Sequence, residues 1–322
     1  MAEIARFFRF DSQPPLIQLV ISFCIVVIAG TMLFWLFIVL GAVVFNISPA
    51  KMIQLPSSYP DPSGRIILKY IQVSQQAGLF LIPSLLAAYL IRRDNESFLR
   101  LRSTPAALHI LLVVLLAVLF IPLINFTGVL NSRMVLPEFL SGIQHWMKTK
   151  EDTASHLTEL LITSSGVLTL GINIFILAIV PAFSEELLFR GLFQQILSRL
   201  FRSSHAGIWT TAIIFSTIHF QFFGFVPRLI LGLLFGYLFY WSGNLWYSII
   251  AHFVNNVIPV AVTYFSGWRT VVGQTGSGKE ILTFPFASVI ISVLILYYFW
   301  REFKRRSVSA SDISSGASES TT

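Results

Sequence analysis

The most constraining feature of the sequence is a series of apolar runs, each long enough to cross a lipid bilayer. A spanning helix needs about 20 consecutive, mainly apolar residues, and such runs recur along the 322-residue chain. Hydrophobic residues make up 55% of the chain and charged residues 11%, whereas a soluble globular domain has about 25% charged residues. The sequence therefore predicts an all-α, polytopic membrane protein.

Length and hydropathy predict about eight spanning helices, which form a single transmembrane domain over residues 1–306. The tail at 307–322 is rich in serine and nearly free of apolar residues, which predicts disorder. A polar connection at about 130–163 has the apolar spacing of a helix that lies at the membrane surface. The expected spans are about 16–45, 67–91, 106–128, 167–200, 207–223, 228–242, 245–264 and 281–300.

Basic residues cluster beside the expected helix ends, in RRDNESFLRLR at 92–102 and in REFKRR at 301–306. Cytoplasmic loops carry an excess of arginine and lysine. We therefore expect a multi-pass protein of the cell membrane with both termini in the cytoplasm. Anionic lipid headgroups account for the net charge of +7, so no nucleic-acid partner is expected.

The stretch SEELLFRGLF at 184–193 places two glutamates and an arginine inside the fourth expected span. An ionisable side chain at the bilayer centre costs about 2.5–3.5 kcal/mol on insertion scales, so such groups pair with one another or line a wet cavity. Glu186 and Arg190 are four residues apart and share a helix face, which predicts an ion pair. Glu185 points about 100° away from Glu186 around the helix, so it is free to contact a different partner.

Two later stretches carry further polar groups in expected spans, FSTIH at 215–219 and HFVNN at 252–256. Phe215 lies four residues before His219, so its ring can pack beneath the imidazole; His252 and Asn256 have the same spacing. The three helices are expected to converge on one buried polar cavity. A carboxylate beside an imidazole can take a proton from water, and an imidazole with an amide N–H can stabilise an oxyanion. These groups suit peptide-bond hydrolysis.

In order and spacing, these stretches resemble the E-E-x-x-x-R, F-x-x-x-H and H-x-x-x-N motifs of the CPBP family, the intramembrane CAAX prenyl endopeptidases and bacteriocin-processing proteins. The resemblance covers Glu185 to Asn256, inside a motif-bearing core of about 167–264. It implies an intramembrane glutamate protease that cleaves a membrane-associated peptide or protein, prenylated or leader-bearing. Carried over by position, Glu185 and His219 activate the water, His252 and Asn256 form the oxyanion site, and Glu186, Arg190 and Phe215 support them.

The family has been described both as metal-dependent and as metal-free. The chain has no H-E-x-x-H motif, which favours an enzyme without a cofactor. Zinc stays an alternative, with Glu185, His219 and His252 as ligands.

Two other classes of function stay open. Intramembrane glutamate and histidine also mark transport and proton pathways, although the chain shows no internal repeat of the kind typical of transporters. A non-catalytic immunity or regulatory protein of the membrane is the second alternative.

Two further patterns concern helix packing. QVSQQ at 72–76 is a polar cluster in the second expected span, and such a cluster is expected to face other helices and not lipid. Gly232 and Gly236 have the G-x-x-x-G spacing that permits close helix contact.

Overall fold

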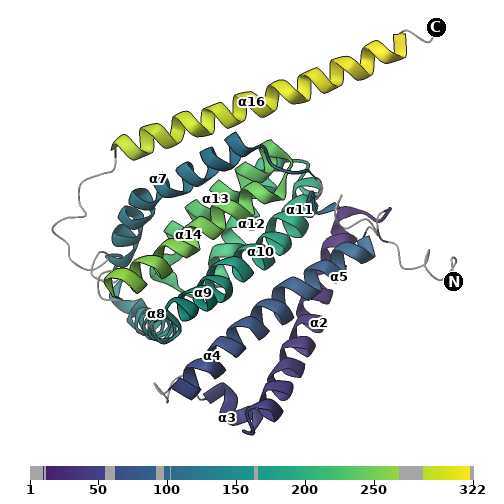
Figure 1. The fold of residues 1–322 in the computed structure, drawn as a ribbon. Helices are drawn as coiled ribbons and strands as arrows, with labels where there is room; N and C mark the ends of the chain where they lie inside the picture. Colours follow the sequence, from purple (N-terminus) through teal and green to yellow (C-terminus); the bar gives the residue numbers. More distant parts are fainter. Residues whose placement is uncertain are drawn as a thin grey trace, which may run out of the picture.

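The computed structural model describes residues 10, 12–54, 62–91, 98–101, 103–162, 166–267 and 286–319, which form helices joined by short connections (Figure 1). These ranges contain no strand. Within them, seven helices are long and apolar enough to cross a bilayer. The chain is therefore an all-α, multi-pass membrane protein, as predicted. The spans are Pro15–Val44, Gly64–Ile91, Ala107–Ser132, Val167–Leu200, Phe222–Ser242, Leu245–Ser266 and Phe286–Lys304.

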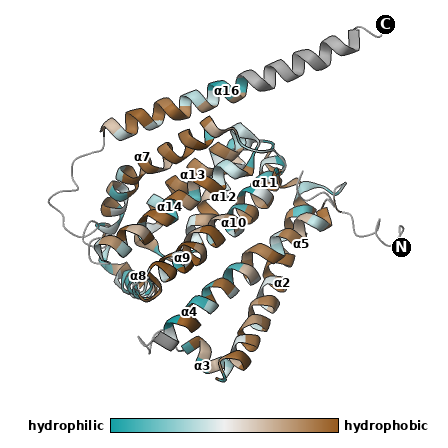
Figure 2. Cartoon of the chain, in the orientation of Figure 1, coloured by the Kyte–Doolittle hydropathy of each residue, from teal (hydrophilic) through white to brown (hydrophobic). Residues whose placement is uncertain are grey.

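The N-terminal helices form a hairpin. Its first arm is α2 (Pro15–Val44), followed by the short α3 (Pro49–Gln54). Its second arm is continuous and consists of α4 (Pro62–Gln75), the π-helical turn η2 (Gln76–Leu81) and α5 (Ile82–Ile91). The arms touch at Gly78, where an added Cβ would lie 2.9 Å from the backbone nitrogen of Phe34. Helix α2 is apolar along its length and presents exposed apolar side chains, as a lipid-facing helix does (Figure 2).

The fourth span is one long helical run that crosses the middle of the bundle. It comprises α9 (Val167–Ile174), η4 (Phe175–Ile179), α10 (Val180–Glu186), η5 (Leu187–Gln194) and α11 (Gln195–Leu200). η4 and η5 are π-helical, and every residue of η5 is buried. π-helical turns are rare and are frequent at functional sites. Their position on either side of α10 therefore indicates a functional site in this segment.

The fifth expected span, 207–223, was wrong. The structure places a shorter helix there, α12 (Ser204–Thr217), of 14 residues. Its length is about 21 Å, against about 30 Å for the hydrocarbon core of a bilayer. The helix ends because the backbone turns at Phe220, which adopts a left-handed φ of 51°, and the short η6 (Phe222–Gly224) follows. His219 therefore lies in a turn and not within a spanning helix.

The next two helices, α13 (Phe225–Ser242) and α14 (Leu245–Ser266), complete the core. Helix α13 lies against α12 through the predicted glycine pair. A Cβ on Gly232 would meet the Ala212 Cβ at 3.0 Å, and one on Gly236 would meet the Ile208 side chain at 2.8 Å. The expectation of close helix contact at these glycines is confirmed.

Helix α7 (Ala107–Ser132) packs against α13, α14 and the last helix, α16 (Phe286–Glu319). Of the last expected span, residues 281–285 lie outside the described residues. The structure continues α16 through the serine-rich residues up to 319, so the expected domain boundary at residue 306 stays a prediction.

The polar connection after α7 forms a short 3-10 turn, η3 (Glu138–Leu140), and the helix α8 (Ser141–Ile162). Helix α8 carries many hydrophilic residues (Figure 2), and its last two residues, Leu161 and Ile162, are buried.

The start of α2 and the part of α16 around Phe303 lie at the same end of the bundle (Figure 1). Gln18 of α2 accepts a hydrogen bond from Arg199 at the end of α11, and Phe303 of α16 packs on His109 at the start of α7. The assignment of this end to the cytoplasm stays a prediction.

Candidate active site

The most deeply buried charges of the site are Glu186 and Arg190, whose side chains are both fully buried. Arg190 Nη1 donates to Glu186 Oε1 over 2.7 Å, which confirms the ion pair expected from their spacing. His252 Nδ1, on α14, lies 2.8 Å from the same carboxylate oxygen. Because an ionised carboxylate can only accept, His252 donates from Nδ1. Glu186 thus fixes the orientation of a histidine from another helix.

The positive charge of Arg190 is compensated by more than its acid partner. Arg190 Nη2 donates to the Gly232 carbonyl oxygen over 3.0 Å. The guanidinium also lies 4.9 Å from the ring centroid of Phe215 and 5.3 Å from that of Phe235. Contacts of this kind are attractive because the ring face carries negative charge density. The buried pair of Glu186 and Arg190 therefore links the fourth span to α12, α13 and α14 and forms a structural centre beneath the site.

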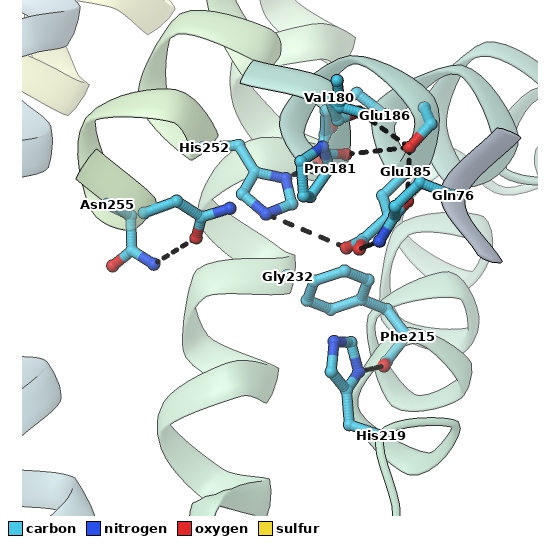
Figure 3. Close-up of polar contacts among 12 residues, drawn as sticks. Gln76, Val180, Pro181, Glu185, Glu186, Phe215, His219, Gly232, His252 and Asn255 are labelled. Atoms are coloured by element: carbon cyan, nitrogen blue, oxygen red, sulfur yellow. Dashed lines mark hydrogen bonds and ion pairs between the residues drawn. The ribbon is translucent and has the colours of Figure 1, made fainter. Parts of the chain in front are cut away.

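Glu185 faces away from this buried pair, as its position on the helix predicts (Figure 3). Its Oε1 accepts a hydrogen bond of 3.0 Å from Gln76 Nε2, and its Oε2 lies 3.9 Å from His252 Nε2. The carboxylate lines a cavity. Two adjacent glutamates therefore have different surroundings, one enclosed in an ion pair and the other at a polar hollow.

Gln76 is a member of the site that the motif reasoning missed. It comes from η2 in the N-terminal hairpin and is almost completely buried. Ser184 Oγ donates to Gln76 Oε1, which leaves the Gln76 amide nitrogen to donate to Glu185. The signal available in the sequence was the polar cluster at 72–76, whose expected contact with other helices is confirmed.

His219 lies at the same cavity but not on the spanning helix that was expected. Its Nδ1 is 2.7 Å from the Phe215 carbonyl oxygen, and its ring lies 5.0 Å from the Phe215 ring (Figure 3). Since a carbonyl oxygen can only accept, Nδ1 carries the proton and Nε2 is left as an acceptor. The predicted packing of Phe215 beneath His219 is confirmed, and the same ring lies 5.9 Å from that of His252.

Asn256 is the fourth predicted site residue, and it lines the cavity together with Glu185 and His219. The spacing of His252 and Asn256 on α14 places both toward this region, as expected. Asn255 Nδ2 donates to Asn256 Oδ1 over 3.4 Å. This contact uses the Asn256 oxygen and leaves its amide nitrogen to act as a donor.

The cavity that these residues line has a volume of about 560 Å³. Gln72, Gln75 and Gln76 line one side, and Asn256, Pro259 and Val260 of α14 line another. Helix α8 supplies a further wall, which consists of Ala154, Leu157, Thr158, Leu161 and Ile162. A hollow of this size with few charges and several amides can hold both water and a short stretch of peptide.

The zinc alternative stays a prediction. Among the residues that the structure describes, no three His, Cys, Asp or Glu side chains gather as a metal-binding group. The hydrogen bonds to Gln76 and Glu186 use Glu185 Oε1 and His252 Nδ1, so Glu185 Oε2 and His252 Nε2 are the atoms that could hold a metal.

Comparison with known proteins adds to this geometry. Residues 167–258 match the family model described as "Type II CAAX prenyl endopeptidase Rce1-like". This segment is therefore similar to the Rce1-like family. The matched segment contains all three motifs and the whole of α9 to α13.

A curated relative also matches part of the chain. YpbD of Bacillus subtilis (strain 168), which is named as an uncharacterized protein, is 32% identical over 90 residues. The alignment spans 27% of this chain and 43% of YpbD, so less than half of the relative is matched. No solved structure matches the chain significantly. The similarity to the Rce1-like family model thus falls on the segment that carries the site.

Proposed function

We propose that this chain is an intramembrane endopeptidase that hydrolyses a peptide bond of a membrane-associated substrate with water activated by Glu185. The observation that carries the proposal is the position of the Glu185 carboxylate, at a polar cavity shared with His219 and Asn256 and 3.9 Å from His252 Nε2. The Rce1-like match of residues 167–258 supports the reaction class.

In the first step, Glu185 takes a proton from a water molecule in the cavity, and the resulting hydroxide attacks the carbonyl carbon of the scissile bond. His219 assists by accepting a hydrogen bond from this water at Nε2, which the Phe215 carbonyl leaves free. Gln76 holds one oxygen of Glu185, so that Oε2 is the oxygen available for the proton.

In the second step, the tetrahedral oxyanion receives hydrogen bonds from His252 and Asn256, an arrangement of the oxyanion-hole type. His252 already donates from Nδ1 to Glu186. A donation from Nε2 therefore requires the doubly protonated imidazole. The bond breaks as Glu185 returns its proton to the leaving amine, which releases a carboxylic acid and a free amine and restores the site.

The substrate is proposed as a peptide that reaches the cavity from the membrane. The family is described by its action on prenylated CAAX proteins, and prenylated and leader-bearing substrates are both consistent with a cavity of this kind. No metal or cofactor is needed for the steps above.

The test combines two measurements on Glu185→Gln, a change that keeps the shape of the side chain and removes its basicity. New protein termini in membranes from wild-type cells, absent with Glu185→Gln, would identify substrates. Cleavage of one such substrate by purified, reconstituted enzyme should then fall by roughly 10²–10⁴-fold in the variant. Glu138→Gln, outside the cavity, serves as the matched control and should keep wild-type activity.

Equal cleavage by the wild type and Glu185→Gln would refute the proposed role of this glutamate. Identical termini in the two cell lines would favour the two other classes, a non-catalytic immunity or regulatory protein and a transporter with a Glu/His relay.

A further inference from the structure

A second polar cavity lies at the other end of the bundle, where α11 ends, α12 begins and α13 ends. Its volume is about 460 Å³, and it shares no lining residue with the cavity of the candidate active site. Arg100 and Arg199 line it, together with the hydroxyl groups of Ser198, Ser204 and Tyr240. None of its described lining residues is acidic. The hollow is thus positively charged and rich in hydrogen-bond donors.

Arg100 is held in place while its guanidinium stays available. Its backbone adopts a left-handed φ of 57°, and its carbonyl oxygen accepts from the Leu245 backbone N–H over 3.1 Å. The guanidinium lies 5.8 Å from the ring centroid of Phe239. Among the described residues it has neither an acidic partner nor a hydrogen-bond acceptor. A fixed backbone and a stacked guanidinium are the features of a pre-positioned anion ligand.

Arg199 adds a second charge that is likewise not neutralised in the described part of the chain. Its Nη2 donates to Gln18 Oε1 over 2.9 Å and its Nε donates to the Gln195 carbonyl oxygen over 3.3 Å. Both acceptors are neutral. The first turn of α12 also opens at this cavity through Ser204, and unpaired N–H groups at a helix start favour anions.

The level of this cavity in the membrane indicates which kind of anion could reach it. Leu200 and Ser242 are the last residues of two membrane spans, and both adjoin the lining residues. The cavity therefore lies where a span leaves the hydrocarbon core and lipid headgroups begin. Basic pockets between spans at this level suit phosphate-bearing headgroups, since an arginine presents two parallel N–H groups to phosphate oxygens.

We propose that this cavity binds the phosphate of an anionic phospholipid, with Arg100 and Arg199 as its ligands. The phosphate sits between the two guanidinium groups, and the hydroxyl groups of the lining donate to its remaining oxygens. The acyl chains stay in the surrounding bilayer. The inference does not depend on the proposed protease activity.

The test uses the purified full-length protein in nanodiscs of phosphatidylcholine to which phosphatidylglycerol is added in steps. The midpoint of thermal unfolding should rise with the phosphatidylglycerol content of the wild type. Arg100→Ala and Arg199→Ala should each weaken the apparent affinity for this lipid by about tenfold, as expected for the loss of a charged hydrogen bond.

Two controls separate a built site from general surface charge. Arg301→Ala removes the same charge from an exposed position on α16 and should leave the lipid response unchanged. Arg100→Lys keeps the charge but loses the planar fork, and it should bind clearly less well than the wild type. It also covers the case in which Arg100→Ala does not fold.

Three results would overturn the proposal. If Arg301→Ala lost the lipid response as fully as Arg100→Ala, the response would come from the surface potential of the protein and not from a built site. An equal rise in the midpoint with inorganic phosphate or glycerol phosphate in pure phosphatidylcholine discs would make the ligand a soluble anion. Lower stability of Arg100→Ala without any dependence on lipid would assign the guanidinium to a contact inside the protein.

Discussion

The N-terminal hairpin and the motif-bearing helices differ in the side chains that they bury and expose. In the most apolar window of α2, 11% of the residues are buried in the chain, whereas 44% are buried in that of α14. The first arm of the hairpin therefore presents its apolar side chains to lipid, whereas 44% of the window in its second arm, Gly64–Ile91, is buried. The motif-bearing helices instead bury ionisable groups and compensate each one with partners from neighbouring helices. Gln76 is the point where the two regions meet, because the hairpin there supplies a hydrogen bond to Glu185.

The largest expected effect concerns the buried ion pair of the motif-bearing helices. Glu186→Gln removes one partner of a fully buried ion pair and leaves Arg190 uncompensated. We expect the free energy of unfolding to fall by about 3–5 kcal/mol, measured by denaturant or thermal unfolding in detergent. The isosteric change at the adjacent residue, Glu185→Gln, is the matched control and should keep most of the stability. A similar loss for both would contradict the separation of a structural from a catalytic glutamate.

The next effect tests whether the hairpin is a rigid unit. Gly78→Ala places a Cβ 2.9 Å from the backbone nitrogen of Phe34, so α2 and η2 must move apart. Overpacking of this kind costs about 1–3 kcal/mol, which unfolding in detergent will measure. Gly171→Ala is the control, because nothing lies within 4 Å of its added Cβ. Equal stability of the two variants would show that the arms are not in close contact.

A smaller effect tests the contact between the two regions. Gln76→Leu removes the hydrogen bond to Glu185, and kcat should fall by about tenfold with KM little changed. Ser184→Ala, which frees the Gln76 amide to rotate, should have a weaker effect in the same direction.

Gln75→Leu is the control for this prediction, since Gln75 lines the same cavity without a described hydrogen bond to Glu185. A fall in kcat for Gln75→Leu equal to that for Gln76→Leu would make the effect one of cavity polarity and not of positioning.

The smallest effect concerns α8, which covers the cavity from a third direction. Burial raises the pKa of Glu151 above its ordinary value, and the positive charge of Arg228 and a hydrogen bond from the Phe223 backbone N–H oppose the rise only in part. A raised carboxyl pKa favours the folded state at low pH. This contribution is lost as pH rises through the folded-state pKa.

The Glu151→Gln variant should therefore lose part of this dependence. Its unfolding midpoint, followed from about pH 4 to about pH 8, should decline less with pH than that of the wild type. Parallel curves for the two proteins would show that Glu151 does not titrate across this range.

The sequence was most informative where spacing alone decides geometry. The four-residue spacing of Glu186 and Arg190 predicted their ion pair, and that of Gly232 and Gly236 predicted close helix contact. Both features depend only on the local helix. The predicted roles of Glu185, His219, His252 and Asn256 in hydrolysis stay predictions, although the structure brings these residues to one region.

What the sequence could not supply depends on contacts between distant segments. Gln76 and Glu185 are 109 residues apart, and a polar cluster within a span does not reveal which helix it will meet. The end of α12 was missed for another reason. A hydropathy window averages across the turn at His219, because the neighbouring side chains are also apolar.

The paired hydrogen bonds along α13 limit how this protein can open. Arg190 donates to the Gly232 carbonyl and Gln194 donates to the Gly236 carbonyl, each over 3.0 Å. Both pairs are offset by four residues, so a slide or rotation of α13 along the fourth span breaks both bonds together. We therefore expect α13 and the fourth span to move together when a peptide enters.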